Sequence, residues 1–268
     1  MFRHTLLRVL YALKFRGRDR LIGGIARSFI SPYVELDDGL RMELDCAEWV
    51  QIEILVKGAT EPLTLNLMSQ LLVDGDTCID VGAHVGHHAL IAARACGKNG
   101  KVLAIDPQPY NADRIARNAQ CNALTNIEVL CAAAGNEDSC IKTNLQSTTD
   151  RARLSLAAPG PNDLGVMIEV PMWRLDTLLA RSKSPNVKLV KIDVEGFELE
   201  VIEGLGDRLL DCENLIFEVL DASDSEKTKL LISVLVDQGF QIRDVEGQNW
   251  RIGQPLRERN VWAHRAKL

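Results

Sequence analysis

The sequence predicts one large α/β domain with a doubly wound, mostly parallel sheet, preceded by a small cap. Its length of 268 residues and 46% apolar content suit a domain of this kind with a sizeable core. From Gly75 onward, short apolar runs alternate with segments of helical period, an alternation that gives parallel strands joined by right-handed crossovers. The first of these strands ends in a glycine-containing turn that leads directly into a helix, as in many ligand-binding sheets.

The first 73 residues form the predicted cap, and residues 74–268 form the main domain. Apolar groups at helical spacing predict a helix over 2–16 with a basic opposite face. A turn sequence between two short apolar runs predicts a β-hairpin over 33–44. Residues 47–72 are predicted to be helical, with a break at a glycine and a proline.

The main domain alternates strands and helices to its end. The predicted strands are 78–82, 102–106, 127–134, 166–173, 187–193, 214–220, 241–245 and 261–265. The predicted helices are 87–96, 112–121, 175–180, 197–210 and 225–238. Residues 135–172 are otherwise irregular. Polar residues join the last two strands, which predicts an antiparallel terminal hairpin in a seven-stranded sheet.

Charge and cysteine content restrict the partners and the compartment. The net charge of −6 argues against a dedicated nucleic-acid binder. Residues 1–30, however, hold seven basic residues and one acid, and two interpretations stay open: a solvated docking helix, or weak contact with an anionic membrane surface. Seven cysteines form no CxxC pair, and no apolar run approaches the ~18–20 residues of a membrane span, so we expect a cytoplasmic protein. The oligomeric state stays open.

The turn after strand 78–82 has the features of a ligand site. Gly82 permits a sharp turn and a close approach to a ligand, and Gly86 lets the following helix pack tightly against the strand. Asp106 ends the next strand, at a spacing that suits a carboxylate bound to both ribose hydroxyls. The turn lacks the glycines of a pyrophosphate site, and Asp80 suits a cationic ligand. S-adenosylmethionine meets these conditions, since it has a ribose, lacks a pyrophosphate and carries a positive charge.

These residues together resemble the FkbM family of S-adenosylmethionine-dependent methyltransferases. The resemblance is carried by VDGDTCIDVGAHVGHHAL (73–90), AIDPQPYNADRIARNAQCN (104–122), WRLDTLL (173–179), LVKIDVEGFELEVIEGL (189–205) and LIFEV (215–219). The block KIDVEGFE is its most specific part. The family's usual Asn in the glycine turn is His84 here, and its usual Phe-Glu-Pro is Ile-Asp-Pro at 105–107.

The resemblance implies a Rossmann-like class I methyltransferase fold, S-adenosyl-L-methionine as cofactor and a hydroxyl acceptor on a sugar or secondary metabolite. It also implies which residues contact the cofactor. Those near its methionine part would be Asp80, Gly82, Ala83, His84 and Gly86. Asp106 would bind the ribose, with Gln108 and Asn111 near the adenosine and Ala132 and Ala133 near the adenine.

Two acids follow the strand 187–193 and are the candidate catalytic residues. Lys191, Asp193 and Glu195 recur at period two, so they project to one side of the strand and its exit. We hypothesise that Asp193 is the general base or hydroxyl anchor, with Glu195 as its partner. In the structural alternative, Lys191 and Asp193 form an ion pair and Glu195 caps the next helix. Glu218, near the end of the predicted strand 214–220, is a third acid at this edge.

The sequence also has features of other kinds of site and function. His84, His87 and His88 suggest a transition metal, but His87 and His88 are adjacent on a helix and cannot easily face one ion together with His84, so we expect no protein-bound metal. A non-catalytic S-adenosylmethionine-binding module is the main alternative function. A nicotinamide-dependent oxidoreductase is less favoured, because none of the three tyrosines lies in a YxxxK arrangement near the strand ends.

Overall fold

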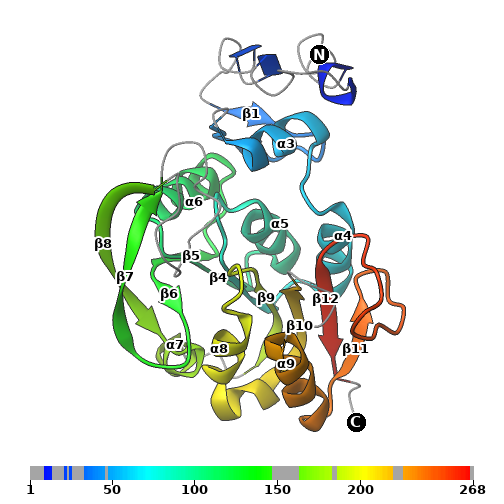
Figure 1. The fold of residues 1–268 in the computed structure, drawn as a ribbon. Coiled ribbons are helices and arrows are strands. Elements are labelled where there is room, and N and C mark those ends of the chain that lie inside the picture. Colours follow the sequence, from blue (N-terminus) through cyan, green and yellow to red (C-terminus); the bar gives the residue numbers. More distant parts are fainter. Residues whose placement is uncertain are drawn as a thin grey trace.

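The computed structural model shows a central sheet with helices on both faces and the cap at one end (Figure 1). The described residues are 9–13, 21–22, 24–25, 33–45, 48–146, 163–182, 186–219 and 226–265. Within these ranges, no helix is both long and apolar enough to cross a membrane. The helix expected over 2–16 lies mostly outside the described residues, although 9–12 are helical.

Seven strands form the central sheet in the order β11-β12-β10-β9-β3-β4-β5. Their bounds are β3 Thr77–Val81, β4 Lys101–Asp106, β5 Ile127–Cys131, β9 Val187–Ile192, β10 Cys212–Glu218, β11 Gln241–Asp244 and β12 Asn260–His264. Strand β12 is antiparallel to both of its neighbours, and the other pairs are parallel. The predicted α/β fold with an antiparallel terminal hairpin is confirmed. The strand order reverses between β3 and β9, the position where doubly wound sheets bind ligands.

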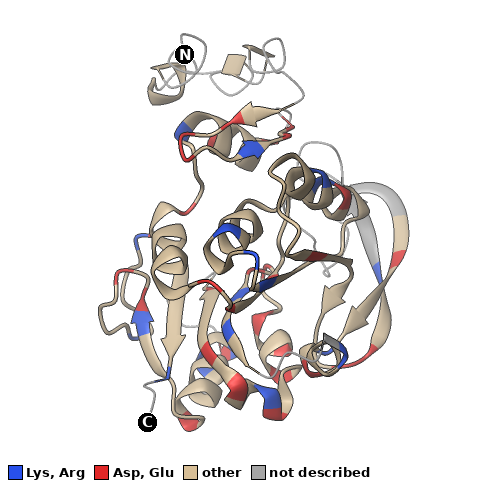
Figure 2. Cartoon of the chain, turned by 180° about the vertical axis from the view of Figure 1, so that it is seen from behind, with Lys and Arg blue, Asp and Glu red and all other residues tan. Residues whose placement is uncertain are grey.

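Helices cover both faces of this sheet, which explains why its strands are almost continuously apolar. Their bounds are α4 Pro62–Leu71, α5 His87–Cys96, α6 Pro109–Cys121, α7 Leu175–Ser182, α8 Glu198–Glu203 and α9 Glu226–Asp237. Cys78 and Val102 pack with α4, α5 and α6 on one face, whereas Ile79 and Val81 pack with α7, α8 and α9 on the other. Acidic and basic residues are interspersed along these elements (Figure 2).

The cap has the predicted hairpin and the predicted helix break. Strands β1 (Val34–Glu35) and β2 (Arg41–Met42) pair antiparallel. Helix α3 (Trp49–Lys57) ends at Gly58, whose φ of 83° is left-handed, and α4 then starts at a proline. The cap packs on α5 and α6 through a separate apolar cluster that includes Met42, Ile54 and Leu90.

Two predicted segments differ from the structure. The strand expected over 127–134 divides into β5 and a short β6 (Ala133–Ala134), and β6 joins a second sheet of order β6-β8-β7. That sheet contains β8 (Asp163–Trp173), which confirms the strand predicted over 166–173, and β7 (Ser139–Gln146), where irregular chain was expected. The prediction was wrong because an apolar run shows that a strand exists but not which partner it pairs with.

The helix expected over 197–210 is also interrupted. Helix α8 ends at Glu203, and a 3₁₀-helix follows at Gly206–Asp211. The two intervening residues include Gly204, whose backbone lies so close to the Gly135 carbonyl that an added Cβ would be 2.0 Å from its oxygen. The helix itself is interrupted at Gly206, whose φ of 49° is left-handed.

The start of α4 depends on a carboxylate from the far end of the chain. Glu258 accepts hydrogen bonds from the Leu63 and Thr64 amides at 2.7 and 2.8 Å and from the Thr64 hydroxyl at 2.8 Å. These groups are otherwise unsatisfied at a helix N-terminus. We expect Glu258→Ala to cost about 2 kcal/mol and to lower the melting temperature by roughly 4–8 °C.

Differential scanning calorimetry measures this shift, and Glu246→Ala is the matched control. Glu246 is exposed in the same C-terminal region, and its carboxylate pairs with the exposed Arg257 at 2.7 Å. We expect the control to melt within 1 °C of the parent, because the loss of a surface ion pair changes the free energy of unfolding only slightly. Equal melting of both variants would contradict the anchoring role of Glu258.

Candidate active site

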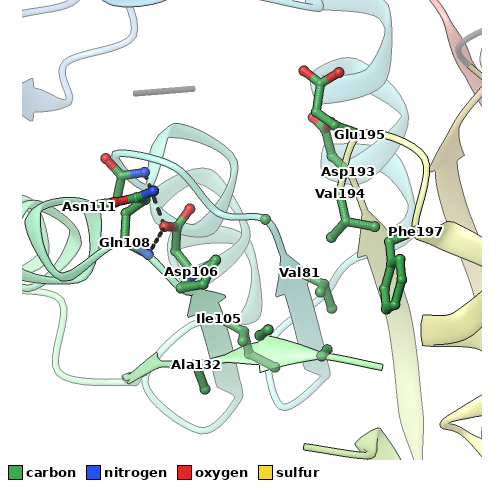
Figure 3. Close-up of a pocket in the computed structure, with 14 residues that line it drawn as sticks. Val81, Ile105, Asp106, Gln108, Asn111, Ala132, Asp193, Val194, Glu195 and Phe197 are labelled. Carbon is green, nitrogen blue, oxygen red and sulfur yellow. Dashed lines mark hydrogen bonds between the residues drawn. The ribbon is translucent and has the colours of Figure 1, made fainter. Parts of the chain in front are cut away.

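Two neighbouring cavities open at the carboxyl ends of the central strands. The first, the β4 cavity, has Ile105, Asp106 and Pro107 in one wall and reaches Ala134 on β6 and Phe197 before α8 (Figure 3). The second, the cap cavity, lies between α3 and the sheet, and its walls include Val50, Ile54 and Thr60. Gly82, Asp193 and Glu195 line both. These three residues therefore form a wall that the two cavities share.

The glycine turn is tight because two backbone segments meet there. Gly82 has φ of 79°, and an added Cβ would lie 1.8 Å from the Asp193 carbonyl oxygen, so only glycine fits. Gly86 also has positive φ, at 91°, but its crowded neighbour is Ile115 of α6, 3.2 Å from an added Cβ, rather than the strand. The expected packing reason for Gly86 is thus corrected to a contact between α5 and α6. Ala83 lines the cap cavity, and Gly86 lines neither cavity.

Asp106 connects this turn to the start of α6. Its Oδ2 accepts a hydrogen bond from the His84 amide at 2.8 Å, and its Oδ1 accepts from the Gln108 amide and the Asn111 side chain at 2.9 and 3.0 Å (Figure 3). Burial raises the pKa of Asp106 to about 6, while these hydrogen bonds act in the opposite direction. The described donors leave one acceptor position on Oδ2, which suits a single further hydroxyl.

The remaining walls of the β4 cavity suit an adenosine. Gln108 is 3% exposed, and its side-chain nitrogen has no hydrogen-bond partner among the described residues, so a donor faces this space without a protein acceptor. Asn111 lies beside it, and Ala132 and Ala133 offer flat apolar wall and backbone at the end of β5. These residues, predicted as a group, are brought together by the fold.

Asp80 lies elsewhere. It is fully buried, neither carboxylate oxygen has a hydrogen-bond partner in the described part of the chain, and it lines neither cavity. Burial raises its pKa, while the ammonium of Lys191, its cross-strand neighbour on β9, acts in the opposite direction. Asp80 is therefore not placed to contact a ligand in either cavity. Its carboxylate lies in the buried region behind the glycine turn, where Lys191 is its cross-strand neighbour.

Lys191 and Asp193 form the ion pair that one of the two interpretations predicted. The Lys191 ammonium lies 3.0 Å from Asp193 Oδ2. Burial alone would lower the pKa of Lys191, but Asp193, Asp80 and Glu61 raise it above its usual value, so this side chain stays protonated. The Asp193 side chain is 28% exposed against 2% for Lys191. Its carboxylate is thus held by a buried cation while still facing both cavities.

His84 binds the cap rather than the β4 cavity. Its Nε2 lies 2.6 Å from Glu48 Oε1, just before α3, and its ring lines the cap cavity. Burial would lower the pKa of His84, but Glu48 outweighs it and the pKa is raised. Among the described residues, no group of three or more histidine, cysteine or acidic side chains could hold a metal ion. His84 and Glu48 therefore form a pair that joins the glycine turn to the cap.

Several residues of the site were missed by sequence reasoning. Glu198, not Glu195, accepts hydrogen bonds from the Val194 and Gly196 amides, at 3.3 and 3.1 Å, in the turn before α8. Glu61 comes from the start of α4, lies 3.3 Å from His88 Nε2 and accepts a hydrogen bond from the Asn260 side chain at 2.8 Å. The role of Glu198 could have been predicted, because acids are favourable near the start of a helix. No local pattern in the sequence marks Glu61.

The fold and site together define a class of protein. A doubly wound sheet that ends in an antiparallel hairpin and carries a glycine turn beside a cavity is typical of S-adenosylmethionine-dependent methyltransferases, and the chain is one. Residues 80–242 match the family described as the Methyltransferase FkbM domain. The chain belongs to the FkbM methyltransferase family.

Individual relatives are more distant. The hexuronic acid methyltransferase AglP of Haloferax volcanii is 29% identical over 173 residues, which cover 62% of this chain and 66% of the relative, just under two thirds. Methyltransferase 1 of Beauveria bassiana is 25% identical over 199 residues, 66% of this chain and 76% of its own. The solved FkbM methyltransferase of Methylobacillus flagellatus is 17% identical, with a TM-score of 0.49, and the match covers 82% of this chain and 53% of that one.

The β4 cavity can be tested with the demethylated cofactor. S-adenosylhomocysteine at 100 times its dissociation constant adds about 2.7 kcal/mol, which we expect to raise the melting temperature by roughly 5–10 °C. Gln108→Leu removes the buried amide donor and should weaken binding roughly tenfold. Gln120→Leu, on the exposed face of the same helix, is the control and should bind like the parent. A Gln108→Leu variant with parental affinity would place the ligand elsewhere.

Proposed function

We propose that this methyltransferase acts on a hydroxyl group of a sugar or secondary-metabolite acceptor bound in the cap cavity, while the cofactor occupies the β4 cavity. The observation that carries the proposal is the shared wall: Gly82, Asp193 and Glu195 line both cavities. A methyl group and an acceptor oxygen that meet across this wall meet beside the Asp193 carboxylate. The sugar methylated by the Haloferax relative, as its name states, supports the acceptor class.

The chain's own residues would supply positioning and a proton acceptor. The bound cofactor supplies a methyl group on a positively charged sulfur. Asp193 would take the hydroxyl proton of the acceptor as the acceptor oxygen receives the methyl group. Holding oxygen, carbon and sulfur in line supplies most of the rate, with effective molarities of ~10⁵ M or more, and a positioned base adds about 10²–10⁴-fold.

Lys191 and Glu195 would act through Asp193. Because Lys191 stays protonated, it cannot accept the proton, but it fixes the orientation of the carboxylate that does. Glu195 has a left-handed φ of 54° next to Gly196, and this strained conformation presents it to both cavities. We therefore assign Asp193 as the base or hydroxyl anchor and Glu195 as its partner at the wall.

For the cofactor, the proposal keeps the residues that face the β4 cavity. Asp106 would bind one ribose hydroxyl, Gln108 and Asn111 the adenosine, and Ala132 and Ala133 the adenine edge. Gly82, Ala83 and His84 would border the methionine end, beside the cap cavity. Asp80 and Gly86 would support the turn from behind. Residues 1–73 would form the cap unit that, with 74–268, shapes the acceptor space; the cytoplasmic location stays a prediction.

Asp193→Asn tests the catalytic assignment. The amide keeps the shape of the side chain and a contact for Lys191 but cannot take a proton. We expect turnover to fall at least 100-fold, with the affinity for S-adenosylhomocysteine changed no more than a few-fold. Release of S-adenosylhomocysteine in single-turnover assays with a pool of sugar and polyol acceptors measures the first quantity, and calorimetry the second.

The control is Asp237→Asn, an exposed aspartate on α9 that lines neither cavity. It should turn over like the parent. Near-parental turnover by Asp193→Asn would remove Asp193 from the mechanism and leave its ion pair as structural. A parent chain that binds S-adenosylhomocysteine but transfers no methyl group to any acceptor would instead favour the non-catalytic binding module.

A further inference from the structure

The walls of the cap cavity carry more negative than positive charge. Its carboxylates are Glu53, Glu61, Asp193, Glu195 and Glu218, and of these Glu53 is paired with Lys57, which lies outside the wall. The permanently charged cations among its described lining residues are Lys191 and Arg259. The charge of Lys191 is balanced by its ion pair with Asp193 in the same wall, and Arg259 lies at the rim with its side chain 63% exposed. His84 adds little, because Glu48 balances it from outside the wall.

Glu218 is a weakly neutralised acid in this wall. It ends β10 with its side chain 11% exposed, and its nearest described cation is Arg259, whose Nη1 is 3.9 Å from Oε1. Its Oε2 is buried and has no hydrogen-bond partner within the described chain. Burial, followed by repulsion, raises the pKa of Glu218 to about 8; the repelling carboxylates are Asp193, Glu195, Glu198 and Glu61. A cation beside it would relieve both effects.

A second, independent group in the same cavity lacks a partner. His87 is 4% exposed, and neither ring nitrogen has a hydrogen-bond partner among the described residues. Burial and the neighbouring His88 lower its pKa to about 3, so the ring is neutral and offers one donor and one acceptor. A hydroxyl group, which also donates and accepts, satisfies such a ring.

We propose that the cap cavity selects an acceptor that bears a protonated amine beside its hydroxyls, with Glu218 binding the ammonium and His87 contacting a hydroxyl. An uncharged polyol binds more weakly, and a carboxylate-bearing sugar is repelled by the wall. The acceptor class thus differs from the hexuronic acid in the name of the Haloferax relative. The inference rests on the proposed function, since it takes the cap cavity as the acceptor site.

Three sugars that differ in one group test the charge preference. They are a methyl glucoside, the same glucoside with its exocyclic hydroxyl replaced by an amine, and the corresponding methyl glucuronide. Each is titrated calorimetrically into the full chain saturated with S-adenosylhomocysteine at pH 7. We expect the amine to bind at least tenfold more tightly than the uronate, with the neutral sugar between them.

Proton release identifies Glu218 as the partner. At pH 7 a carboxyl group with a pKa of about 8 is mostly protonated, and an ammonium beside it lowers that pKa. Binding of the amine should therefore release most of one proton, seen as a dependence of the binding enthalpy on the ionisation enthalpy of the buffer. The neutral sugar should release none.

Two variants change the preference in opposite directions. Glu218→Gln should abolish proton release and reduce amine affinity at least fivefold without changing that of the neutral sugar. Arg259→Gln removes the competing rim cation and should strengthen amine binding a few-fold, so the test survives a failure of the first variant to fold. Glu226→Gln, whose side chain is 90% exposed on α9, is the matched control and should behave like the parent.

The result that overturns the inference is equally specific. Uronate binding as tight as that of the amine, amine binding without proton release, or no binding of any of the three sugars to the S-adenosylhomocysteine-loaded chain would each refute it. The first two outcomes leave the proposed methyl transfer untouched, since it is judged by turnover and by Asp193→Asn. Loss of that function would likewise leave the binding preference measurable.

Discussion

One buried ammonium, that of Lys191, holds the active centre together. Its side chain is 2% exposed, and a charge so placed must be balanced by acids. Asp193 at the end of β9, Asp80 on β3 and Glu61 at the start of α4 supply that balance. Removing one member of such a cluster leaves an uncompensated charge that typically costs about 3–5 kcal/mol. The need to neutralise Lys191 therefore fixes the position of the proposed base and joins the cap to the sheet.

The Asp106 carboxylate also has two roles: it holds the fold locally, and it leaves a position for a ligand. Three of its acceptor positions hold the glycine turn and the start of α6, and one is left for a ribose hydroxyl. A longer glutamate, usual in the family at this position, would place its oxygens farther from the turn. The shorter aspartate therefore extends less far toward the ligand, but its hydrogen bonds hold the turn that carries Gly82 in place.

The parts of this site that the sequence could predict are those built from residues close together along the chain. The glycine turn, Asp106 and the Lys191–Asp193 pair follow from residues next to one another on strands and their exits, where period and spacing are informative. The second sheet could not be predicted, because β6, β7 and β8 find their partners only in three dimensions. Glu61, Glu218 and His87 converge on the cap cavity from separate elements. Their roles depend on burial and neighbouring charge, which no single segment reveals.

The attachment of α4 to the C-terminal hairpin has a consequence for synthesis of the chain. Glu258 binds Leu63 across 195 residues, and Asn260 donates to Glu61 of the cap cavity. The glycine turn, Asp106 and the alanines after β5 all lie in the first half of the chain, so that part of the β4 cavity can assemble while the ribosome is still translating the second half. The cap cavity acquires the wall that carries Arg259 only after the residues before β12 emerge, so the acceptor space is completed later than this part of the β4 cavity.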